Sequence, residues 1–486
     1  MRSFSSHVAS PFLLTLTLVY VARAATPVVH VTSPANGSSV TGPVNYVAAA
    51  SAPGCKQGVK AIRIYSAPSV EAFTGSGDRI NTYINLNPGT YNTVVQAWDN
   101  CGNVGKTNVT ITVTSVAQPA GFVYTVGFDM NNLQSTTIQG FTIVPGNGAL
   151  AKTLQGPVTA NVDPVALAPD KGGYRLYVAD YVSGDVFAYF IDRQNGHLDP
   201  VPGAPFAANR SVAAVAVHPR GKLIFAALSE YAPGDGVAVF QLQDDGSLKL
   251  APGSPYATQT GPQGLTMDPD GNYLYVADGS GYIDAFQIDT VSAALTPLPG
   301  SPYPTPVVAA CGNTYPRDVF DLNGKYLYNA DGTAGVADGF AIEPTTGTLT
   351  ALSGSPWEDT HCEGGSGIDY VQAWMSPRSL AVEGTGKFLY ALNEFEDNIA
   401  IYSIASNGAL KFKKFTPANS ACYGAVRTDS TGNYLYAGGC TLSYTNPGYN
   451  LLVGFSINHT TGDLTPLPTR RTRSRKAADP KCRISP

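Results

Sequence analysis

Charged side chains recur at corresponding places in this chain, each beside a short apolar run rich in tyrosine and leucine. Five carboxylates follow such runs, namely Asp180, Glu230, Asp278, Asp331 and Glu394. Other runs are preceded by a further set of polar residues, namely Gln263, Arg317 and Arg378. A guanidinium is a rigid fork that binds a carboxylate or a phosphate, and a carboxylate can accept a proton from water. These residues predict a binding site for a small polar or anionic ligand.

The apolar runs are copies of one phrase, built like Tyr-Leu-Tyr-Val-Ala-Asp, which occurs seven times. Its central aromatic residues are Tyr124, Tyr177, Phe225, Tyr275, Tyr328, Tyr390 and Tyr436. Successive copies are 46 to 62 residues apart, which is the period of four-stranded repeats. The sequence therefore predicts an all-β fold with a seven-bladed β-propeller over residues 120–469. We expect the aromatic side chains to pack between neighbouring blades.

Each repeat divides into four short strands between turn residues. In the fourth repeat we predict strands at residues 264–268, 273–277, 282–288 and 295–298. The first two strands of a blade run antiparallel, so the start of the inner strand and the end of the second strand emerge on one face. Gln263 and the two arginines lie at inner-strand starts, and the five carboxylates lie at second-strand ends. We therefore expect all eight around the central axis on that face.

These candidates have simpler alternative roles. A carboxylate at a strand end often accepts hydrogen bonds from backbone N–H groups of the next turn and takes no part in chemistry. His361 is the histidine that we place on the same face, in a long connection, and its alternative is a solvated loop residue. His218 stands in the phrase His-Pro-Arg-Gly, which predicts a turn on the opposite face.

The ends of the predicted ring do not match. The first repeat begins with its second strand, at Phe122, so its inner strand should come from the other end of the chain. That end, from Arg470 to Lys476, is a basic run without a strand pattern. We therefore expect a three-stranded first blade and a basic, flexible tail at residues 470–486.

Charge argues against nucleic acid as a partner. The tail holds seven basic residues and one acidic residue, so the rest of the chain has a formal charge of −11 within the total of −5. An acidic body without a basic stripe does not fit a nucleic-acid interface.

Residues 1–24 have the pattern of a signal peptide. Arg2 gives a basic start, an apolar run extends from Pro11 to Val21, and Ala22-Arg23-Ala24 precedes the expected cleavage. The protein is therefore predicted to be secreted, periplasmic or on the cell surface. No later stretch reaches the roughly 18 to 20 apolar residues of a membrane helix, so no membrane span is expected after cleavage.

Residues 26–116 form short alternating runs, which are typical of an antiparallel β-sandwich. Their phrases at residues 32–37, 88–91 and 96–103 resemble a bacterial Ig-like domain. Such modules mostly act as spacers or adhesive stalks, so we assign no catalysis to this one.

The seven cysteines fit an oxidising destination and suggest three disulfides. Cys55 and Cys101 fall in loops that meet at one end of such a sandwich. The other expected pairs are Cys311 with Cys362 and Cys422 with Cys440. No Cys-x-x-Cys or His-x-x-x-His spacing occurs, so no metal site is expected.

The repeat resembles the secreted lactonase-type propellers, which include 6-phosphogluconolactonase-like and muconate-cyclizing enzymes and the Tyr-Val-Thr-Asn repeat proteins. The likeness covers all seven repeats, most clearly Asp268-Pro269-Asp270-Gly271-Asn272-Tyr273-Leu274-Tyr275-Val276-Ala277. In lactonase-like enzymes an Asn-Glu pair follows a Gly-Lys-Phe-x-Tyr strand, and residues 386–394 reproduce that spacing. The resemblance thus implies Glu394 as general base, with Arg378 and Arg317 orienting the substrate or stabilising an oxyanion. The two arginines depart from the family's usual Glu-Ile-Arg phrase.

The resemblance implies a hydrolase that opens a small sugar or organic-acid lactone without a cofactor, with His361 among its catalytic candidates. The alternative is a non-catalytic extracellular module that binds a polysaccharide or a protein. Calcium is a third alternative, and no dense Asp/Asn cluster supports it.

Overall fold

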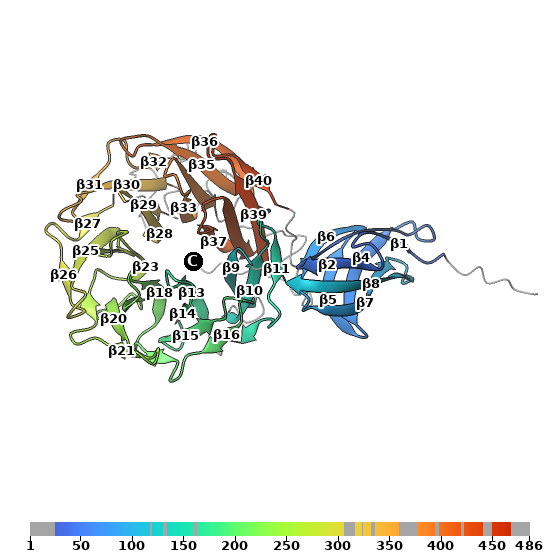
Figure 1. The fold of residues 1–486 in the computed structure, drawn as a ribbon. Helices are drawn as coiled ribbons and strands as arrows, with labels where there is room; N and C mark the ends of the chain where they lie inside the picture. The colour runs from blue at the N-terminus through green and yellow to red at the C-terminus, as the bar shows by residue number, and fades with distance from the viewer. Residues whose placement is uncertain are drawn as a thin grey trace, which may run out of the picture. The chain divides into compact units, whose positions relative to one another are not determined.

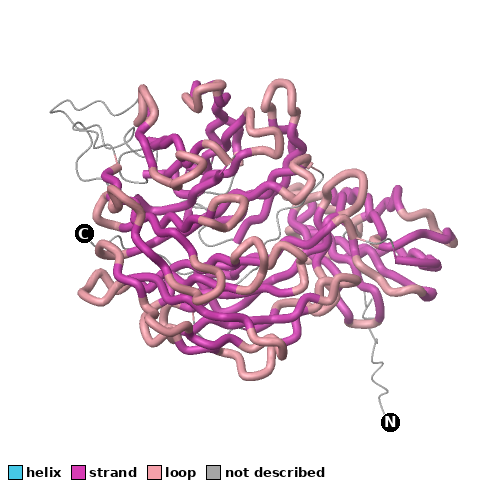
Figure 2. The backbone as a smooth tube through the Cα atoms, turned by 60° about the vertical axis from the view of Figure 1, so that its left-hand side comes forward, coloured by secondary structure: helices cyan, strands magenta, loops and turns pink. Residues whose placement is uncertain are grey.

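The computed structural model describes residues 25–116, 119–129, 134–159, 163–305, 316–322, 324–331, 336–358, 377–393, 398–418, 422–440 and 450–467. Within these residues every regular element is a β-strand (Figure 1, Figure 2). The same residues contain no helix that is long and apolar enough to cross a membrane. The prediction of an all-β fold is confirmed.

The chain divides into two compact units. One contains Met1–Val31, Ala48–Ile80 and Asn92–Val109, and the other contains Thr32–Val47, Asn81–Tyr91 and Thr110–Pro486. The domain limits expected at residues 26–116 and 120–469 stay predictions. The expected signal segment and basic tail, residues 1–24 and 470–486, lie outside the described residues.

The strands up to residue 116 form two sheets. The first has the order β1 (Val28–Ser33), β3 (Val44–Ser51) and β6 (Arg79–Ile84). The second has the order β2 (Ser38–Gly42), β8 (Val104–Val116), β7 (Gly89–Asp99), β4 (Val59–Ala67) and β5 (Val70–Ser76). Alternate residues of β3 and β7 are buried, so each strand presents one face to a core. The likeness to Ig-like domains stays a prediction.

Cys55 and Cys101 form the disulfide that the sequence predicts. Their Cα atoms lie 5.8 Å apart, within the usual range for a bridge. Cys311 and Cys362 lie outside the described residues. Cys422 and Cys440 are direct backbone partners on adjacent strands, and their pairing stays a prediction.

Seven sheets follow, arranged around a common axis in Figure 1. In the second to seventh sheets the first strand lies nearest the axis and the next strands pair outward in chain order. The second and third sheets contain β13 (Pro164–Pro169), β14 (Arg175–Asp180), β15 (Asp185–Ile191), β16 (Leu198–Pro200) and β17 (Phe206–Ala207), then β18 (Val212–Val217), β19 (Leu223–Leu228), β20 (Gly236–Leu242), β21 (Leu248–Leu250) and β22 (Tyr256–Ala257).

The fourth and fifth sheets follow the same plan. They contain β23 (Pro262–Met267), β24 (Tyr273–Asp278), β25 (Tyr282–Ile288), β26 (Leu295–Pro297) and β27 (Tyr303–Pro304), then β28 (Pro316–Leu322), β29 (Tyr326–Asp331), β30 (Val336–Ile342), β31 (Leu349–Ala351) and β32 (Trp357–Glu358). The four strands predicted in the fourth repeat agree with β23 to β26 within two residues at each end. The alternation of apolar runs and turn residues therefore predicted the repeat well.

The sixth and seventh sheets have four strands each among the described residues. They contain β33 (Pro377–Val382), β34 (Phe388–Asn393), β35 (Asn398–Ile404) and β36 (Leu410–Pro417), then β37 (Cys422–Thr428), β38 (Tyr434–Cys440), β39 (Asn450–Ile457) and β40 (Leu464–Pro466).

The outer edge of the second to fifth sheets is divided between two short strands, which the sequence did not predict. In the fourth sheet β26 pairs with one half of β25 and β27 with the other. Between them the Ser301 hydroxyl accepts a hydrogen bond from the N–H of Ala285, at 2.8 Å. The Pro-Gly-Ser-Pro phrase thus fills the gap between the two halves, because its serine replaces a missing ladder carbonyl.

The first sheet begins with a strand that corresponds to the second strand of the other sheets. It contains β9 (Gly121–Asp129), β10 (Gln134–Ile143), β11 (Leu150–Lys152) and β12 (Val158–Thr159). β9 and β10 pair as the second and third strands do in the other sheets, and β11 and β12 divide the outer edge. No strand pairs with the inner edge of β9 in the part of the chain that the structure describes. Residues 468–486 lie outside the described residues, so the three-stranded first blade stays a prediction.

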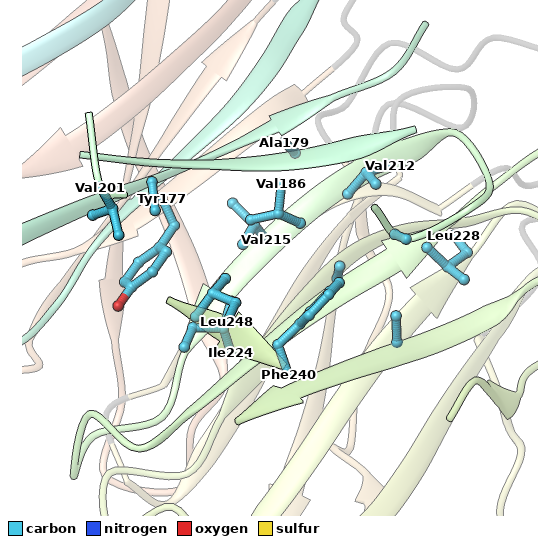
Figure 3. Close-up of a cluster of buried hydrophobic side chains, with 14 residues drawn as sticks. Tyr177, Ala179, Val186, Val201, Val212, Val215, Ile224, Leu228, Phe240 and Leu248 are labelled. Atoms are coloured by element: carbon cyan, nitrogen blue, oxygen red, sulfur yellow. The ribbon is translucent and has the colours of Figure 1, made fainter. Parts of the chain in front are cut away.

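Apolar side chains fill the spaces between neighbouring sheets. Between the second and third sheets, Tyr177 and Val186 pack against Ile224 and Phe240 (Figure 3). Each side chain of this size stabilises the fold by roughly 1.5–3 kcal/mol when it is removed from water. A similar cluster joins the first sheet to the seventh, with Phe141 of β10 against Leu452 of β39. The ring is therefore closed here by side-chain packing.

The central tyrosine of the repeated phrase also makes a hydrogen bond to the next sheet. Its hydroxyl donates to the carbonyl of a glycine in the hairpin before the outer strand, at 2.7 to 3.1 Å. The pairs are Tyr124 with Gly196, Tyr275 with Gly347, Tyr328 with Gly408, Tyr390 with Gly462 and Tyr436 with Gly148. The last pair joins the seventh sheet to the first. Burial raises the pKa of all five tyrosines, so each hydroxyl keeps its proton and donates.

Two sheets depart from this rule. The third sheet has Phe225, which has no hydroxyl, and the hairpin beside it has Ala293 in place of glycine. The second sheet has Tyr177, whose buried hydroxyl has no hydrogen-bond partner among the described residues.

We predict that Tyr275→Phe lowers the free energy of unfolding by about 1 kcal/mol, because it removes the donor to the Gly347 carbonyl. Urea denaturation followed by circular dichroism measures this loss. Tyr177→Phe is the matched control and should leave the stability unchanged or slightly higher. Equal losses in both variants would contradict a stabilising role for the hydrogen bond between sheets.

Candidate functional site

The innermost strand of each repeat starts beside the end of the second strand. Pro262 pairs with Asp278, and Pro316 pairs with Asp331 in the next sheet. Pro377 of the sixth sheet pairs with Asn393 in the same way. In these three sheets the start of the inner strand therefore lies beside the end of the second strand, and the site expected there stays a prediction. We call this set of strand starts and strand ends, in the second to sixth sheets, the inner rim.

A β-bulge follows the first residue of each of these innermost strands. The register shifts between Pro262 and Gly264, and the residue that it skips is Gln263. Arg317 and Arg378 are skipped at the same place in the next two sheets. A bulge leaves one residue unpaired and redirects it, and bulges are common beside active sites. Three of the predicted polar residues therefore occupy equivalent backbone positions in three successive sheets.

Gln263 links two neighbouring sheets. Its side chain is partly exposed, and its Nε2 donates to Oγ of Ser229, just after β19 of the third sheet, at 2.9 Å. The carboxamide oxygen of Gln263 adds acceptor capacity at the same point of the rim.

Asp180 and Asp278 are fully buried at the ends of β14 and β24. The Asp180 carboxylate accepts hydrogen bonds from the N–H groups of Asp163, at 2.8 Å, and Ser183, at 2.9 Å. The Asp278 carboxylate accepts from the N–H and the hydroxyl of Ser280, at 2.8 and 2.7 Å. These are the contacts of residues that hold turns, the alternative role considered from the sequence.

Asp278 has a second carboxyl group beside it, which the sequence analysis missed. Asp284 lies on β25 opposite Val276, and Val276 packs against Phe225 of the third sheet. The Oδ2 atom of Asp278 is buried and has no hydrogen-bond partner among the described residues, so the two carboxyl groups lie close to each other without full solvation. Burial and the nearby charge of Asp278 raise the pKa of Asp284 to about 7, and burial raises the pKa of Asp278. A polar residue inside an apolar strand was the signal for this pair.

An arginine that the sequence analysis did not select organises the rim at the third sheet. The Arg210 guanidinium pairs with Glu230, at 3.0 Å, and with the buried Asp235, at 3.2 Å. The Asp235 carboxylate also accepts from the N–H of Gly261, at 2.8 Å, at the start of the fourth sheet. The Glu230 side chain remains 41% exposed, so its carboxylate is open to a ligand.

The five predicted carboxylates do not occupy one register position. Asp180, Asp278 and Asp331 are equivalent final residues of the second strand. Glu230 comes two residues after Leu228, the end of β19, and Glu394 comes one residue after Asn393, the end of β34. The five carboxylates therefore take three different positions along the sequence: the last residue of the second strand, one residue after it, or two residues after it.

For several predicted residues the structure does not describe the side chain. Glu394 and His361 lie outside the described residues. Arg317, Arg378 and Asp331 are placed by their backbone alone. Asn393, just before Glu394, is buried, and its Nδ2 donates to Oδ1 of Asn398 at 2.8 Å.

His218 lies in the turn that the sequence predicts, away from the inner rim. It is buried, and its Nδ1 accepts from the N–H of Arg220 at 3.0 Å. Its Nε2 therefore carries the proton and donates to the carbonyl of Gly271, in the fourth sheet, at 2.8 Å. Burial lowers the pKa of His218, which suits a neutral structural histidine.

In the described residues one group of three side chains has the proximity of metal ligands, namely Cys55, Asp99 and Cys101. The two cysteines form the disulfide, so neither offers a thiolate. The Asp99 carboxylate accepts from the N–H groups of Cys101, at 2.9 Å, and Asn103, at 2.8 Å. This group therefore does not fit a metal ion.

We predict that Asp284→Asn changes how stability depends on pH. Between the ordinary pKa of 3.8 and the folded value of about 7, native Asp284 keeps a proton that the unfolded chain loses. The unfolding free energy of the wild type therefore falls across this window as the pH rises, and the variant lacks that fall. Denaturant titrations from pH 4 to 8 should show the variant gaining stability relative to the wild type, by a few kcal/mol at most.

Asp289→Asn is the control for this experiment. Hydrogen bonds from Ser292 and Val291 lower the pKa of Asp289, so its contribution to stability is lost as the pH falls. This loss occurs below the ordinary pKa of 3.8, so the difference between this variant and the wild type should stay constant from pH 4 to 8. A difference for Asp284→Asn that does not vary with pH would contradict the raised pKa of Asp284.

The family described as lactonase, seven-bladed beta-propeller, matches residues 195–310 and 365–477 of this chain. These segments include Gln263, Arg378 and Glu394. No curated protein matches the sequence.

Solved structures with similar folds include three bacterial proteins. The periplasmic gluconolactonase of Pseudomonas aeruginosa has a TM-score of 0.55 at 18% identity, over 72% of this chain and 96% of its own. A putative 6-phosphogluconolactonase from Bacteroides fragilis has a TM-score of 0.52 at 22% identity, over 72% and 94%. A protein from Lactobacillus plantarum has a TM-score of 0.53 at 19% identity, over 71% and 95%. The chain thus has the fold of these proteins, and two of its segments match the seven-bladed lactonase family.

Proposed function

We propose that this protein hydrolyses the lactone of a small sugar or organic acid at the inner rim. The two segments that match the lactonase family support this reaction class. The observation that carries the proposal is the recurring bulge, which gives Gln263, Arg317 and Arg378 one equivalent position in three successive sheets. Glu394 directly follows the second strand that pairs with the Arg378 strand.

The proposed reaction adds one water to the lactone. Glu394 accepts a proton as the water oxygen attacks the carbonyl carbon, and Arg317 and Arg378 stabilise the oxyanion that forms. The bond between that carbon and the ring oxygen then breaks, and the ring oxygen takes the proton from Glu394. The product is a hydroxy acid, which releases a proton to solvent. His361 is a further catalytic candidate in this proposal.

The proposed substrate-binding residues divide into two kinds. Glu230 and Gln263 have side chains that solvent reaches, so they can contact a ligand directly. Asp180 and Asp278 hold the turns of the rim from within, and Asp331 occupies the equivalent backbone position in the fifth sheet. The partner in this proposal is a small anionic or polar molecule.

We propose further that the protein is exported. The signal-peptide pattern of residues 1–24 and the disulfide between Cys55 and Cys101 both support an oxidising compartment. A fold similar to a periplasmic gluconolactonase is compatible with this location.

We expect the wild-type protein to open at least one member of a lactone panel, and Glu394→Gln to reduce that rate by about 10²- to 10⁴-fold, the contribution of a general base. The panel contains glucono-δ-lactone, its 6-phosphate and muconolactone. Acid release in a pH-stat, corrected for spontaneous hydrolysis, measures the rate.

Glu343→Gln is the matched control, because Glu343 lies in the hairpin between β30 and β31 and its carboxylate accepts from Thr345. This variant should keep the wild-type rate. Unchanged hydrolysis by Glu394→Gln would remove Glu394 from the mechanism. A folded wild-type protein that opens no lactone would favour the alternative, a non-catalytic binding module.

A further inference from the structure

Two residues with a strained backbone lie close together at the part of the inner rim that belongs to the third sheet. Tyr231 has a φ of 55°, and Asn209 has a φ of 64°. Besides Ala293, these are the only described residues of the propeller other than glycine with a positive φ. A left-handed conformation is costly for a large side chain and often marks a functional site. Both residues flank the ion pair between Arg210 and Glu230, which holds them in one place.

The Tyr231 ring has a seat made by two glycines. A Cβ atom on Gly261 would lie 2.6 Å from the ring, and one on Gly279 would lie 2.8 Å from it. Gly261 has a φ of 73° and needs to be glycine for its backbone. Gly279 has no such requirement, so its missing side chain serves to make room for the ring. The seat joins the start of β23 to the end of β24, which places the ring on the inner rim.

Tyr231 is exposed at the surface in addition to its contact with the two glycines. The residue is 57% exposed although its ring rests on the backbone of the fourth sheet. Its immediate sequence neighbour is Glu230, whose carboxylate is open to solvent. The partly exposed Gln263 lies two residues after Gly261. An exposed aromatic ring thus stands among hydrogen-bonding side chains.

This combination fits a sugar ring. A sugar has faces of C–H groups, which suit the electron-rich face of an aromatic ring, and a rim of hydroxyl groups, which suit carboxylate and carboxamide side chains. A protein partner would need a larger contiguous apolar surface than one tyrosine among charged residues. A ligand without hydroxyl groups would make no such hydrogen bonds to Glu230 or Gln263.

We propose that Tyr231 is a stacking platform that binds the sugar ring of the ligand, with Glu230 and Gln263 hydrogen-bonded to its hydroxyl groups. This inference deepens the proposed function and rests on it for the reaction, because it selects sugar lactones over lactones of simple organic acids. The platform binds its ligand whether or not the ring is opened.

Isothermal titration with D-glucono-δ-lactam, a stable ring analogue, tests the platform on the full-length protein. Tyr231→Gly removes the ring and relieves the backbone strain, so the fold is not harmed. We expect about a 5- to 10-fold weaker affinity in this variant, as for the loss of one aromatic contact. Tyr231→Phe should bind as the wild type does. Gly279→Ala, which fills the seat of the ring, should weaken binding.

Two controls make the result specific. Tyr174→Ala removes a tyrosine of similar exposure, 54%, from the turn before β14, and should leave the affinity unchanged. δ-Valerolactam has the same ring without hydroxyl groups and should bind the wild type more weakly. Wild-type protein that does not bind gluconolactam, or Tyr231→Gly protein that binds it as tightly as the wild type, would overturn the platform.

Hydrolysis separates this inference from the proposed function. Binding that depends on Tyr231 in a protein that opens no lactone would support the platform and refute the lactonase. Hydrolysis of glucono-δ-lactone with the same KM in wild type and Tyr231→Gly would support the lactonase and refute the platform.

Discussion

The hydrogen bond from the central tyrosine of one sheet to a glycine carbonyl of the next is the constraint on which the propeller depends. Five such bonds are described, and the bond from Tyr436 to Gly148 joins residues 288 positions apart in the chain. It closes the ring where the first sheet has no inner strand among the described residues. Apolar packing around Phe141 supplies most of the energy there, and the hydrogen bond fixes the register between the sheets.

The inner rim follows from this closure. Because each sheet is held at a fixed place relative to its neighbours, the bulge at the start of each innermost strand occurs at an equivalent place around the axis. The bulge releases one residue from pairing and so frees it for function. In the fourth to sixth sheets that residue is Gln263, Arg317 or Arg378. The fold thus determines where the unpaired bulge residues lie, and the sequence determines which side chains they carry.

Much of the fold could be predicted from the sequence because the repeat is carried by local patterns. The Tyr-Leu-Tyr phrase and the turn residues around it located the strands of the fourth sheet within two residues. The face on which Asp278 lies follows from antiparallel pairing alone. The prediction of a first sheet without an inner strand came from the basic run at residues 470–476, which lies outside the described residues.

The site was harder to predict, because its chemistry depends on contacts between sheets. The burial of a carboxylate could not be predicted from its position after a strand: Asp278 is buried beside Asp284, whereas Glu230 is open to solvent. Tyr231 could not be selected from the sequence, because its place in the proposed site depends on its left-handed backbone and on a glycine nearly fifty residues away, Gly279. Neither feature leaves a periodic pattern.

A crystal structure of the protein with bound D-glucono-δ-lactam tests the central claim most directly, because it shows where a ligand meets the ring of sheets. The account predicts the ligand on the inner rim, with one face of its ring on Tyr231 and its hydroxyl groups within hydrogen-bonding distance of Gln263 and Glu230. A ligand bound on the opposite face, beside the turn of His218, would contradict it.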